Sequence, residues 1–143
     1  MKLHIVTVGE PKLAYARAGW DEYLSRLKHY HQVRVTHVAD KHAYDPAYLL
    51  QMAGSAYKIA LVIGGEQLAS PQLAQFLEKR ALEGREVCLL VGGPEGLPSA
   101  VISEADSQWS LSKLTFPHDL AMVILLEALY RASTISAGQP YHK

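Results

Sequence analysis

Two short loops of this sequence carry the residue types best suited to holding a small ligand. The first loop, residues 92–96, reads G-G-P-E-G and follows the apolar, β-prone run 87–91. The second, residues 112–118, reads S-K-L-T-F-P-H and follows a short run that ends at Leu111. Glycine has no Cβ, so the first loop lets the backbone approach a ligand closely. Loops at the carboxyl ends of neighbouring strands form the ligand site of open α/β sheets, so we expect these two loops to be the walls of one pocket.

The second loop is suited to binding a flat heterocycle with its backbone. Pro117 biases Phe116 towards an extended conformation, which leaves the peptide groups of residues 111–116 outside a helix and free to hydrogen-bond the edge of a ring. The apolar side chains of Leu111, Leu114 and Phe116 would then contact its faces. His118 is either part of this site or a histidine that caps, or packs beneath, the following helix.

Other kinds of site are less well supported. The first loop matches neither G-x-G-x-x-G nor G-x-x-x-x-G-K-[ST], which disfavours a P-loop NTPase and leaves open a turn without a ligand. His29 and His31, two positions apart on an expected helix, point to different faces, so we expect no metal site. No Ser-His-Asp order and no pair of carboxylates stands out. Cys88 lies within an apolar run, so we expect a buried thiol and a reducing cytoplasm.

Residues 26–42 are rich in positive charge, with Arg26, Lys28, Arg34, Lys41 and four histidines against one acid. This cluster is either a solvated helix end or a patch that faces phosphate. The whole chain carries 14 basic and 14 acidic side chains, so its formal net charge is zero. Zero net charge disfavours a general nucleic-acid binder but leaves a local basic patch possible.

Length and periodicity predict one α/β domain over residues 1–143. Hydrophobic residues make up 49% and charged residues 20% of the chain, which is typical of a globular protein. The most apolar stretch, 120–126, is far shorter than the roughly 20 residues that span a bilayer, and the start does not resemble a signal peptide. We therefore expect a soluble, cytoplasmic protein with no membrane partner.

Apolar spacing predicts strands and helices in alternation. The strands are expected at 3–8, 33–38, 58–63, 87–91 and 107–111. Helices are expected at 12–30, 45–57, 70–84 and 119–137, with a short helix that begins at residue 98. Ser70 is expected to cap the helix at 70–84. This order predicts a parallel sheet covered by helices on both faces, a three-layer α/β/α domain.

The last helix is apolar on nearly every side over residues 120–130. A surface helix needs only one apolar stripe, so this one must be covered twice. The sheet is one cover, and a second subunit related by a two-fold axis is the simplest other cover. The alternative is a fully central helix, which so small a domain accommodates poorly. Arg131, one turn after Glu127, is expected to form an intrahelical ion pair.

Four motifs, in order along the chain, resemble one known family. They are V-G-G-P-E-G-L at 91–97, S-L-S-K-L-T-F-P-H at 110–118, E-A-L-Y-R-A at 127–132 and the closing P-Y-H-K. With the opening M-K-L-x-I-V-x-V-G, they resemble the ribosomal RNA large subunit methyltransferase H family, of the SPOUT class. The resemblance implies a homodimeric α/β domain whose C-terminal part forms a trefoil knot, although general topology rules disfavour knots.

The resemblance also implies a reaction. This is the transfer of a methyl group from S-adenosylmethionine to N3 of a pseudouridine in 23S rRNA, on assembled ribosomes. The implied cofactor-binding residues are Leu61, Gly92, Leu111, Ser112, Lys113, Leu114, Thr115 and Phe116. Except for Leu61, these positions fall on the two loop walls inferred from the residues alone.

In such a reaction the N3 proton of the base must be lost, and a nearby acceptor or cation assists. We assign that catalytic role to His142, with Tyr141 and Lys143 as RNA contacts. In a homodimer this tail could reach the partner's pocket; the alternative is a terminus that frays. A neutral chain holds free RNA poorly, so we expect the preformed surface of a ribosome as its substrate.

Two rival functions remain open from the sequence. One is a non-enzymatic, ribosome-associated module. The other is an α/β nucleotide-binding enzyme that acts on a small metabolite, a function that keeps the glycine loop but leaves the tail unexplained.

Overall fold

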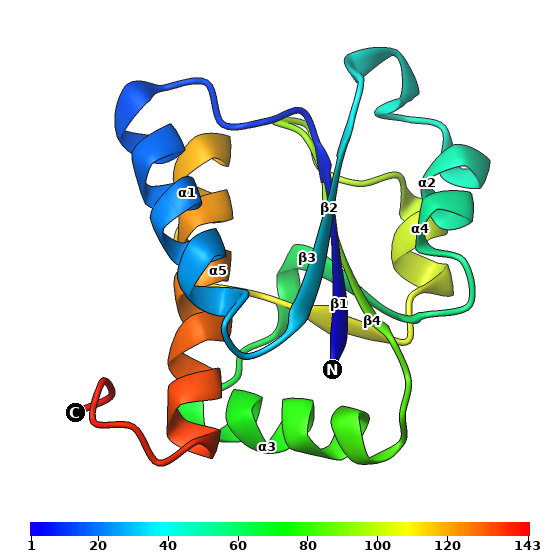
Figure 1. The fold of residues 1–143 in the computed structure, drawn as a ribbon. Helices are drawn as coiled ribbons and strands as arrows, with labels where there is room; N and C mark the ends of the chain where they lie inside the picture. Colours follow the sequence, from blue (N-terminus) through cyan, green and yellow to red (C-terminus); the bar gives the residue numbers. More distant parts are fainter.

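A computed structural model describes all 143 residues and has a five-stranded, all-parallel sheet in the order β2-β1-β4-β3-β5 (Figure 1). The strands are β1 (Lys2–Val8), β2 (Gln32–Val38), β3 (Tyr57–Glu66), β4 (Val87–Val91) and β5 (Ser107–Trp109). The helices are α1 (Ala14–Leu27), α2 (Pro46–Ala53), α3 (Ser70–Leu82), α4 (Ser99–Glu104) and α5 (His118–Ser136), with a short 3₁₀ turn at Asp40–His42. The predicted alternation of strands and helices and the parallel sheet are confirmed.

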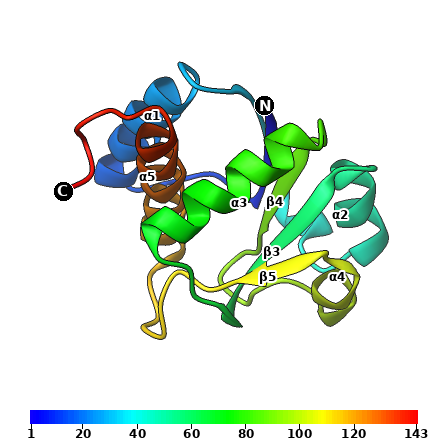
Figure 2. The same ribbon diagram turned by 90° about the horizontal axis from the view of Figure 1, so that it is seen from below.

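Helices cover both faces of this sheet. Helices α1, α3 and α5 lie on one face, and α2 and α4 lie on the other (Figures 1 and 2). Successive residues of a strand point to opposite faces, so Leu3 and Ile5 of β1 enter the core beneath α1 and α5, while Val6 and Val8 enter the core beneath α2. Strand β4 is buried along its whole length, which explains its uninterrupted apolar sequence. The three-layer prediction is therefore confirmed.

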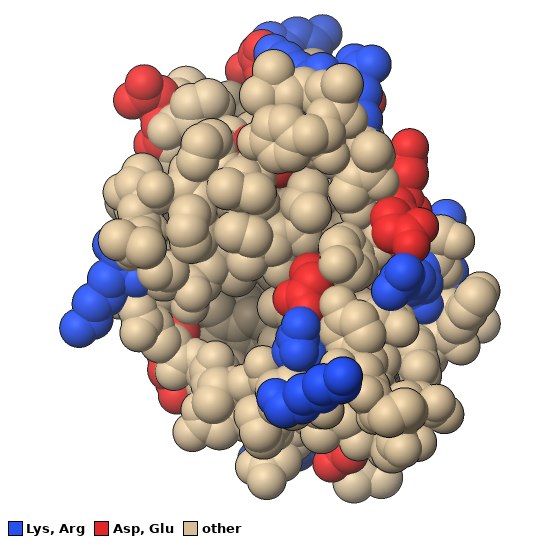
Figure 3. Space-filling view, turned by 90° about the vertical axis from the view of Figure 1, so that its left-hand side faces the viewer, with Lys and Arg blue, Asp and Glu red and all other residues tan.

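Helix α5 packs against the sheet, α1 and α3. It approaches α1 so closely that a Cβ at Gly19 would lie 2.9 Å from a methyl carbon of Val123. Its outward side chains, among them Leu120 and Ile124, remain half-buried. The surface over α1 and α5 faces the viewer in Figure 3. Its upper middle is uncharged, whereas acidic and basic groups gather just below its centre and around its edges. One chain thus covers most of this helix but not all of it, and the predicted homodimer stays a prediction.

Several predicted helix ends are wrong. Helix α1 begins at Ala14 and ends at Leu27, because the chain turns over residues 28–31 so that the Gln32 N–H can donate to the Met1 carbonyl, at 3.0 Å. His29 and His31 therefore lie beyond the helix. Helix α2 ends at Ala53, where Gly54 takes a φ of +59° that ends the helix.

The predicted N-cap of α3 is also wrong by one residue. The cap is Ala69 rather than Ser70, and the Ala69 N–H donates to the side-chain oxygen of Gln72, at 2.7 Å. Pro71 occupies the first turn as expected. Two strand ends differ as well, since β3 continues through Gly64 and Gly65 to Glu66, and β5 ends at Trp109 instead of Leu111.

Two further features bear on the sequence predictions. The sheet order and helix placement suit the SPOUT-type arrangement, while the trefoil knot remains a prediction. No helix is both long and apolar enough to cross a membrane, and no group of three or more His, Cys, Asp or Glu side chains could hold a metal ion.

Candidate functional site

A cavity of about 610 Å³ opens at the carboxyl edge of the sheet. Its walls come from three segments that each follow or end a strand: residues 61–63 of β3, residues 91–97 at the end of β4, and residues 110–118 between β5 and α5. Ile102 of α4 and Ala121 of α5 complete the lining. The two predicted loops are therefore neighbours, as expected, and they line one cavity.

The first loop is folded tightly on itself. The Gly96 N–H donates to the Gly93 carbonyl, at 2.9 Å, and Gly96 has a φ of +83°, a conformation that favours glycine. A Cβ at Gly92 would lie 2.5 Å from the carbonyl carbon of Gly96 and 2.6 Å from the nitrogen of Leu97. Glycine is thus required at position 92 by the loop's own backbone, whatever ligand lies beyond it.

The second loop offers unpaired backbone groups. Residues 111–116 lie outside any helix or strand, and none of them forms a hydrogen bond with another backbone group. Two side-chain bonds hold the loop instead: Ser110 Oγ donates to the Ser112 carbonyl at 2.9 Å, and the Leu114 N–H donates to Ser112 Oγ at 3.0 Å. The remaining N–H and C=O groups of this loop are available to a ligand, which confirms the predicted conformation.

A third wall was missed by reasoning from the residues alone, although the resemblance implied one of its members, Leu61. Leu61 and Glu66 both pair with Trp109 of β5, so the four residues between them form a bulge. Gly65 allows the bulge to lie this close to β5, since a Cβ at this position would lie 2.6 Å from the carbonyl carbon of Trp109. The bulge presents Val62 and Ile63 to the cavity, and Ile63 is 61% exposed. The pair Gly64-Gly65 directly after a β-branched run was the available signal.

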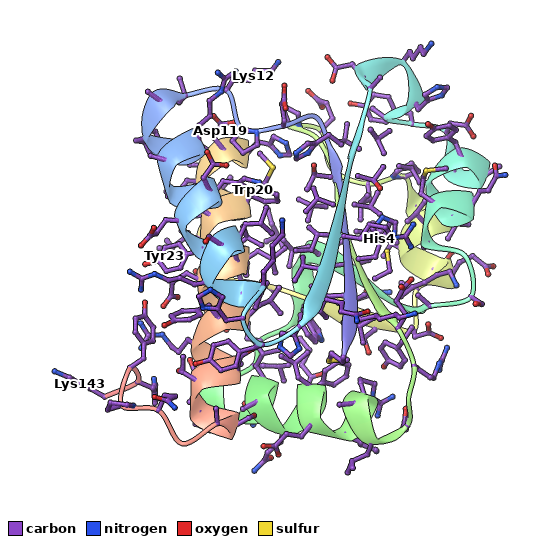
Figure 4. All side chains as sticks on the ribbon, in the orientation of Figure 1. His4, Lys12, Trp20, Tyr23, Asp119 and Lys143 are labelled. Carbon is purple, nitrogen blue, oxygen red and sulfur yellow. The ribbon has the colours of Figure 1, made fainter.

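The start of α5 closes the cavity and fixes its position. His118 lines the cavity and donates from Nε2 to the Val8 carbonyl of β1, at 2.9 Å, so its side chain does not cap α5. The carboxylate of Asp119 accepts from the N–H groups of Lys12 and Leu13, at 2.9 and 2.7 Å (Figure 4). Burial raises the pKa of this carboxyl group, but the two backbone donors and nearby positive charge outweigh burial and lower it.

Most of the predicted cofactor residues line this cavity. Those that do so are Leu61, Gly92, Leu111, Ser112, Thr115 and Phe116. Lys113 and Leu114 do not line it, and Leu114 is 70% exposed. Both follow the turn at Ser112, where the Leu114 N–H donates to Ser112 Oγ. The binding role of all eight residues stays a prediction.

The C-terminal tail lies far from this cavity in the same chain. Helix α5 has 19 residues, which at the 1.5 Å rise of an α-helix gives a length of about 28 Å. Asp119 lies at one end of this helix and Lys143 beyond the other (Figure 4). One chain therefore does not bring Tyr141, His142 and Lys143 to its own cavity.

The tail packs against α5 of its own chain. The ring of Tyr141 meets Tyr130 edge-on with centroids 4.7 Å apart, and its hydroxyl donates to Glu127, at 3.2 Å. Arg131 forms the predicted ion pair with Glu127, at 2.7 Å, and its guanidinium also donates to Nδ1 of His142, at 3.2 Å. The tail is held at this end of the helix by its own chain.

The basic cluster of residues 26–42 does not form one patch. Arg26 pairs with Glu22 at 2.7 Å on α1, and Arg34 pairs with Glu86 at 3.3 Å. Lys41 belongs to the 3₁₀ turn after β2, at the other edge of the sheet. Lys28 forms no ion pair. Cys88 is buried in β4 as predicted, and burial raises the pKa of its thiol to about 12.

Comparison with known proteins extends over the whole chain. The family described as "Predicted SPOUT methyltransferase" matches residues 1–142. Proteins named "Ribosomal RNA large subunit methyltransferase H" are 50% identical in Deinococcus radiodurans, 43% in a strain of Thermus thermophilus and 40% in Bifidobacterium adolescentis. Each alignment covers 100% of this chain and 99% or 100% of the relative.

Proposed function

This chain belongs to the SPOUT methyltransferase family, and from that premise we propose that it transfers a methyl group from S-adenosylmethionine to N3 of a pseudouridine in 23S rRNA on assembled ribosomes. The observation that carries the proposal is the cavity at the carboxyl edge of the sheet, with its wall of unpaired backbone groups. The names of the relatives, which span the chain at up to 50% identity, support rRNA as the substrate class. They disfavour both rival functions, the non-enzymatic module and the enzyme acting on a small metabolite.

The cavity fits a nucleoside-type cofactor. Its volume of about 610 Å³ falls within the range of about 300–1,000 Å³ that is common for small-molecule sites. The free N–H and C=O groups of residues 111–116 match the donors and acceptors at the edge of an adenine ring, and Leu111 and Phe116 supply apolar surface for its faces. When bound there, S-adenosylmethionine would supply an electrophilic sulfonium methyl group.

The protein's own contribution is mainly one of position. The three walls are held by backbone contacts that leave little freedom, because both Gly92 and Gly65 lie against neighbouring backbone. Asp119 ties the start of α5 to the loop before α1, and His118 ties it to the end of β1. Such a fixed site aligns the two reacting groups and lowers the entropic part of the barrier.

His142 is our candidate for the group that accepts the N3 proton. In the isolated chain the Arg131 guanidinium donates to Nδ1 of His142, so in the neutral ring the proton is on Nε2. To accept a proton, the imidazole must leave Arg131 and present a free nitrogen to the base. The contact with Arg131 is therefore a resting position, and entry into a catalytic site releases it.

The distance between tail and cavity supports a homodimer in which each site is shared. A helix of about 28 Å separates the two in one chain, so His142 can serve a cavity only in a partner subunit. The half-buried side chains of α5 and the uncharged upper middle of the face in Figure 3 offer a surface for that partner. Tyr141 and Lys143, beside His142, would contact the RNA at the shared site.

The experiment that tests the function is transfer of radiolabelled methyl from S-adenosylmethionine to assembled ribosomes that lack the modification. Naked 23S rRNA and ribosomes that already carry the methyl group are the controls. Label on the unmodified ribosomes alone is the expected result. Cofactor binding without label on any RNA would overturn the substrate assignment and favour the metabolite enzyme.

A mixing experiment tests the shared site. A Gly92→Val chain has a disrupted cavity and an intact tail, and a His142→Ala chain has the reverse. Each alone should be inactive, whereas co-expression should restore about a quarter of wild-type activity, because half of the dimers are mixed and each has one intact site. No recovery in verified mixed dimers would show that the tail acts within its own chain or not at all.

A further inference from the structure

A second cavity lies at the opposite, amino edge of the sheet. It has a volume of about 760 Å³ and is lined by the start of β1, the turn 28–32 between α1 and β2, and residues 81–86 between α3 and β4. An adjoining cavity of about 620 Å³ shares Lys2 and Lys28 with it and adds Arg34. No step of the proposed methyl transfer uses this edge.

The lining of this amino-edge cavity is cationic. Lys2, Lys28 and Arg85 come from three separate segments of the chain, and none of them forms an ion pair. The one carboxylate, Glu86, already pairs with Arg34 at 3.3 Å. The amino terminus at Met1 adds a further positive charge. Cations that gather without a counter-charge repel one another, so a bound anion would stabilise the group.

The turn that carries Lys28 is held firmly in place. His31 Nε2 donates to Ser133 Oγ, at 2.8 Å, and Ser133 Oγ donates in turn to the Leu129 carbonyl of α5, at 2.8 Å. Burial, together with the charge of the amino terminus, lowers the pKa of His31 to about 4, so its ring is neutral near pH 7 and fixes the turn. The guanidinium of Arg85 lies over the ring of Tyr57, 5.3 Å from its centroid. The cations are therefore presented on a preformed surface.

We propose that the amino-edge cavity binds backbone phosphate groups of the RNA substrate through Lys2, Lys28 and Arg85. This inference rests on the proposed function, because it takes the substrate to be RNA. The two adjoining cavities share Lys2 and Lys28, while Arg34 in the second one is paired with Glu86. A track of cations spread over two adjoining cavities suits a chain of phosphates better than a single small anion.

The position of the track relative to the tail agrees with this role. The turn 28–32 and the last turns of α5 lie side by side, since the rings of Tyr30 and Tyr130 are 6.1 Å apart and His31 bonds Ser133. The tail leaves the molecule from the same end (Figure 1). If the tail of one subunit enters the partner's carboxyl-edge cavity, the phosphate track comes with it. RNA held on the track then reaches the site in which its base is methylated.

The test compares two double variants that change net charge equally. Lys28→Ala/Arg85→Ala removes two cations of the track. Lys41→Ala/Lys79→Ala removes two unpaired cations that line neither cavity. Binding of each protein to assembled ribosomes is measured by filter binding over a range of salt concentrations, without cofactor, and thermal unfolding verifies that each variant folds.

We expect the track variant to bind ribosomes about tenfold more weakly than the wild type, and the slope of log affinity against log salt to fall in magnitude by about 1–2. The control variant should bind within about twofold of the wild type, because exposed cations away from the interface are screened. The charge-retaining variant Lys28→Arg/Arg85→Lys should keep most of the affinity. Equal affinities for the two alanine variants would overturn the proposal.

A parallel assay of methyl transfer by the wild type separates this inference from the proposed function. Transfer to ribosomes with no difference between the alanine variants refutes the phosphate track alone. Ribosome binding without transfer refutes the proposed function, while the comparison of variants still decides the track. Absence of ribosome binding by the wild type refutes both.

Discussion

The two edges of the sheet present different kinds of surface. The cavity at the carboxyl edge is built from loops with unpaired backbone groups and apolar side chains, and Glu95 is the one lining residue with a full charge. The cavity at the amino edge is lined by three cations that form no ion pair. They lie near the start of β1, before β4, and on the turn 28–32, which the bond from His31 to Ser133 holds in place. The first edge suits a ligand recognised by shape and hydrogen-bond pattern, and the second suits one recognised by charge. Under our two proposals, binding of cofactor and binding of RNA take place at opposite edges of one small domain.

The largest effect is expected from Gly92→Val, which tests whether the carboxyl edge alone holds the cofactor. Its Cβ would lie 2.5 Å from the Gly96 backbone, so the loop must shift and the free energy of unfolding should fall by about 1–3 kcal/mol. Calorimetry should detect no binding of S-adenosylmethionine, while ribosome binding persists.

The matched control is Gly64→Ala, because no atom lies within 4 Å of a Cβ at that glycine. It should change the free energy of unfolding by no more than about 0.5 kcal/mol. Loss of ribosome binding along with cofactor binding, in a folded Gly92→Val protein, would break the separation of the two edges.

His142→Ala should separate catalysis from both kinds of binding. We expect kcat to fall by about 100-fold or more, as is usual on loss of a proton acceptor. Cofactor affinity should stay within about twofold, since the tail lies a helix length from its own chain's cavity. Single-turnover methyl transfer and calorimetry measure the two quantities, with Gln139→Ala as the control in the same tail. Unchanged turnover would contradict the role of His142.

Alanine substitutions at Leu111 and Leu114 test which side chains of the second loop contact the cofactor. Leu111 lines the cavity, whereas Leu114 does not and is 70% exposed. Leu111→Ala should weaken cofactor binding by about tenfold, the loss expected for a partly buried apolar contact, and Leu114→Ala by no more than about twofold. Equal effects in a titration would mean that the loop changes conformation when the cofactor binds.

A further comparison is the difference between the two edges in their response to acid. His31 has a folded pKa of about 4 against 6.5 in the unfolded chain, so the unfolded state binds the proton first. The free energy of unfolding should therefore fall as the pH drops from about 6.5 to about 4. Asp119 has a lowered pKa, so its contribution is present above the ordinary value of 3.8 and is lost as the pH falls below it.

Denaturant titrations at a series of pH values check this order. His31→Gln should reduce the slope of unfolding free energy against pH between about pH 4 and 6.5. Some slope should remain there because burial also lowers the pKa of His4. Asp119→Asn should reduce the slope only below about pH 3.8. The reverse pattern would contradict the assignment of the two windows.

The sequence predicts the carboxyl edge better than the amino edge for a physical reason. Loops 92–96 and 112–118 are continuous in the chain and carry glycine and proline, whose backbone preferences are local. The third wall depends on how Leu61 and Glu66 pair with β5, a register that no local pattern encodes. That Lys113 and Leu114 lie outside the cavity lining depends likewise on how the loop folds in three dimensions.

The amino edge brings together residues that are far apart in the sequence. Lys2, Lys28 and Arg85 meet only because β1 pairs with both β2 and β4. The sequence marks Lys28 as part of a basic cluster, but it cannot show that Arg26 and Arg34 are neutralised by Glu22 and Glu86. Helix ends are uncertain for a similar reason, since the end of α1 is set by the pairing of Gln32 with Met1.

The bond between Asp119 and the loop before α1 has a consequence for how the protein is made. It joins positions 107 and 106 residues apart, and α5 is the element that covers α1. While the chain is being synthesised, α1 can pack against β1 and β2, but its contacts with α5 must wait until the last helix emerges. The core cluster that holds the buried side chains of α5 can therefore be completed only when synthesis is nearly finished, and pairings across so much sequence slow folding. Until then the nascent chain exposes apolar surface, which favours aggregation.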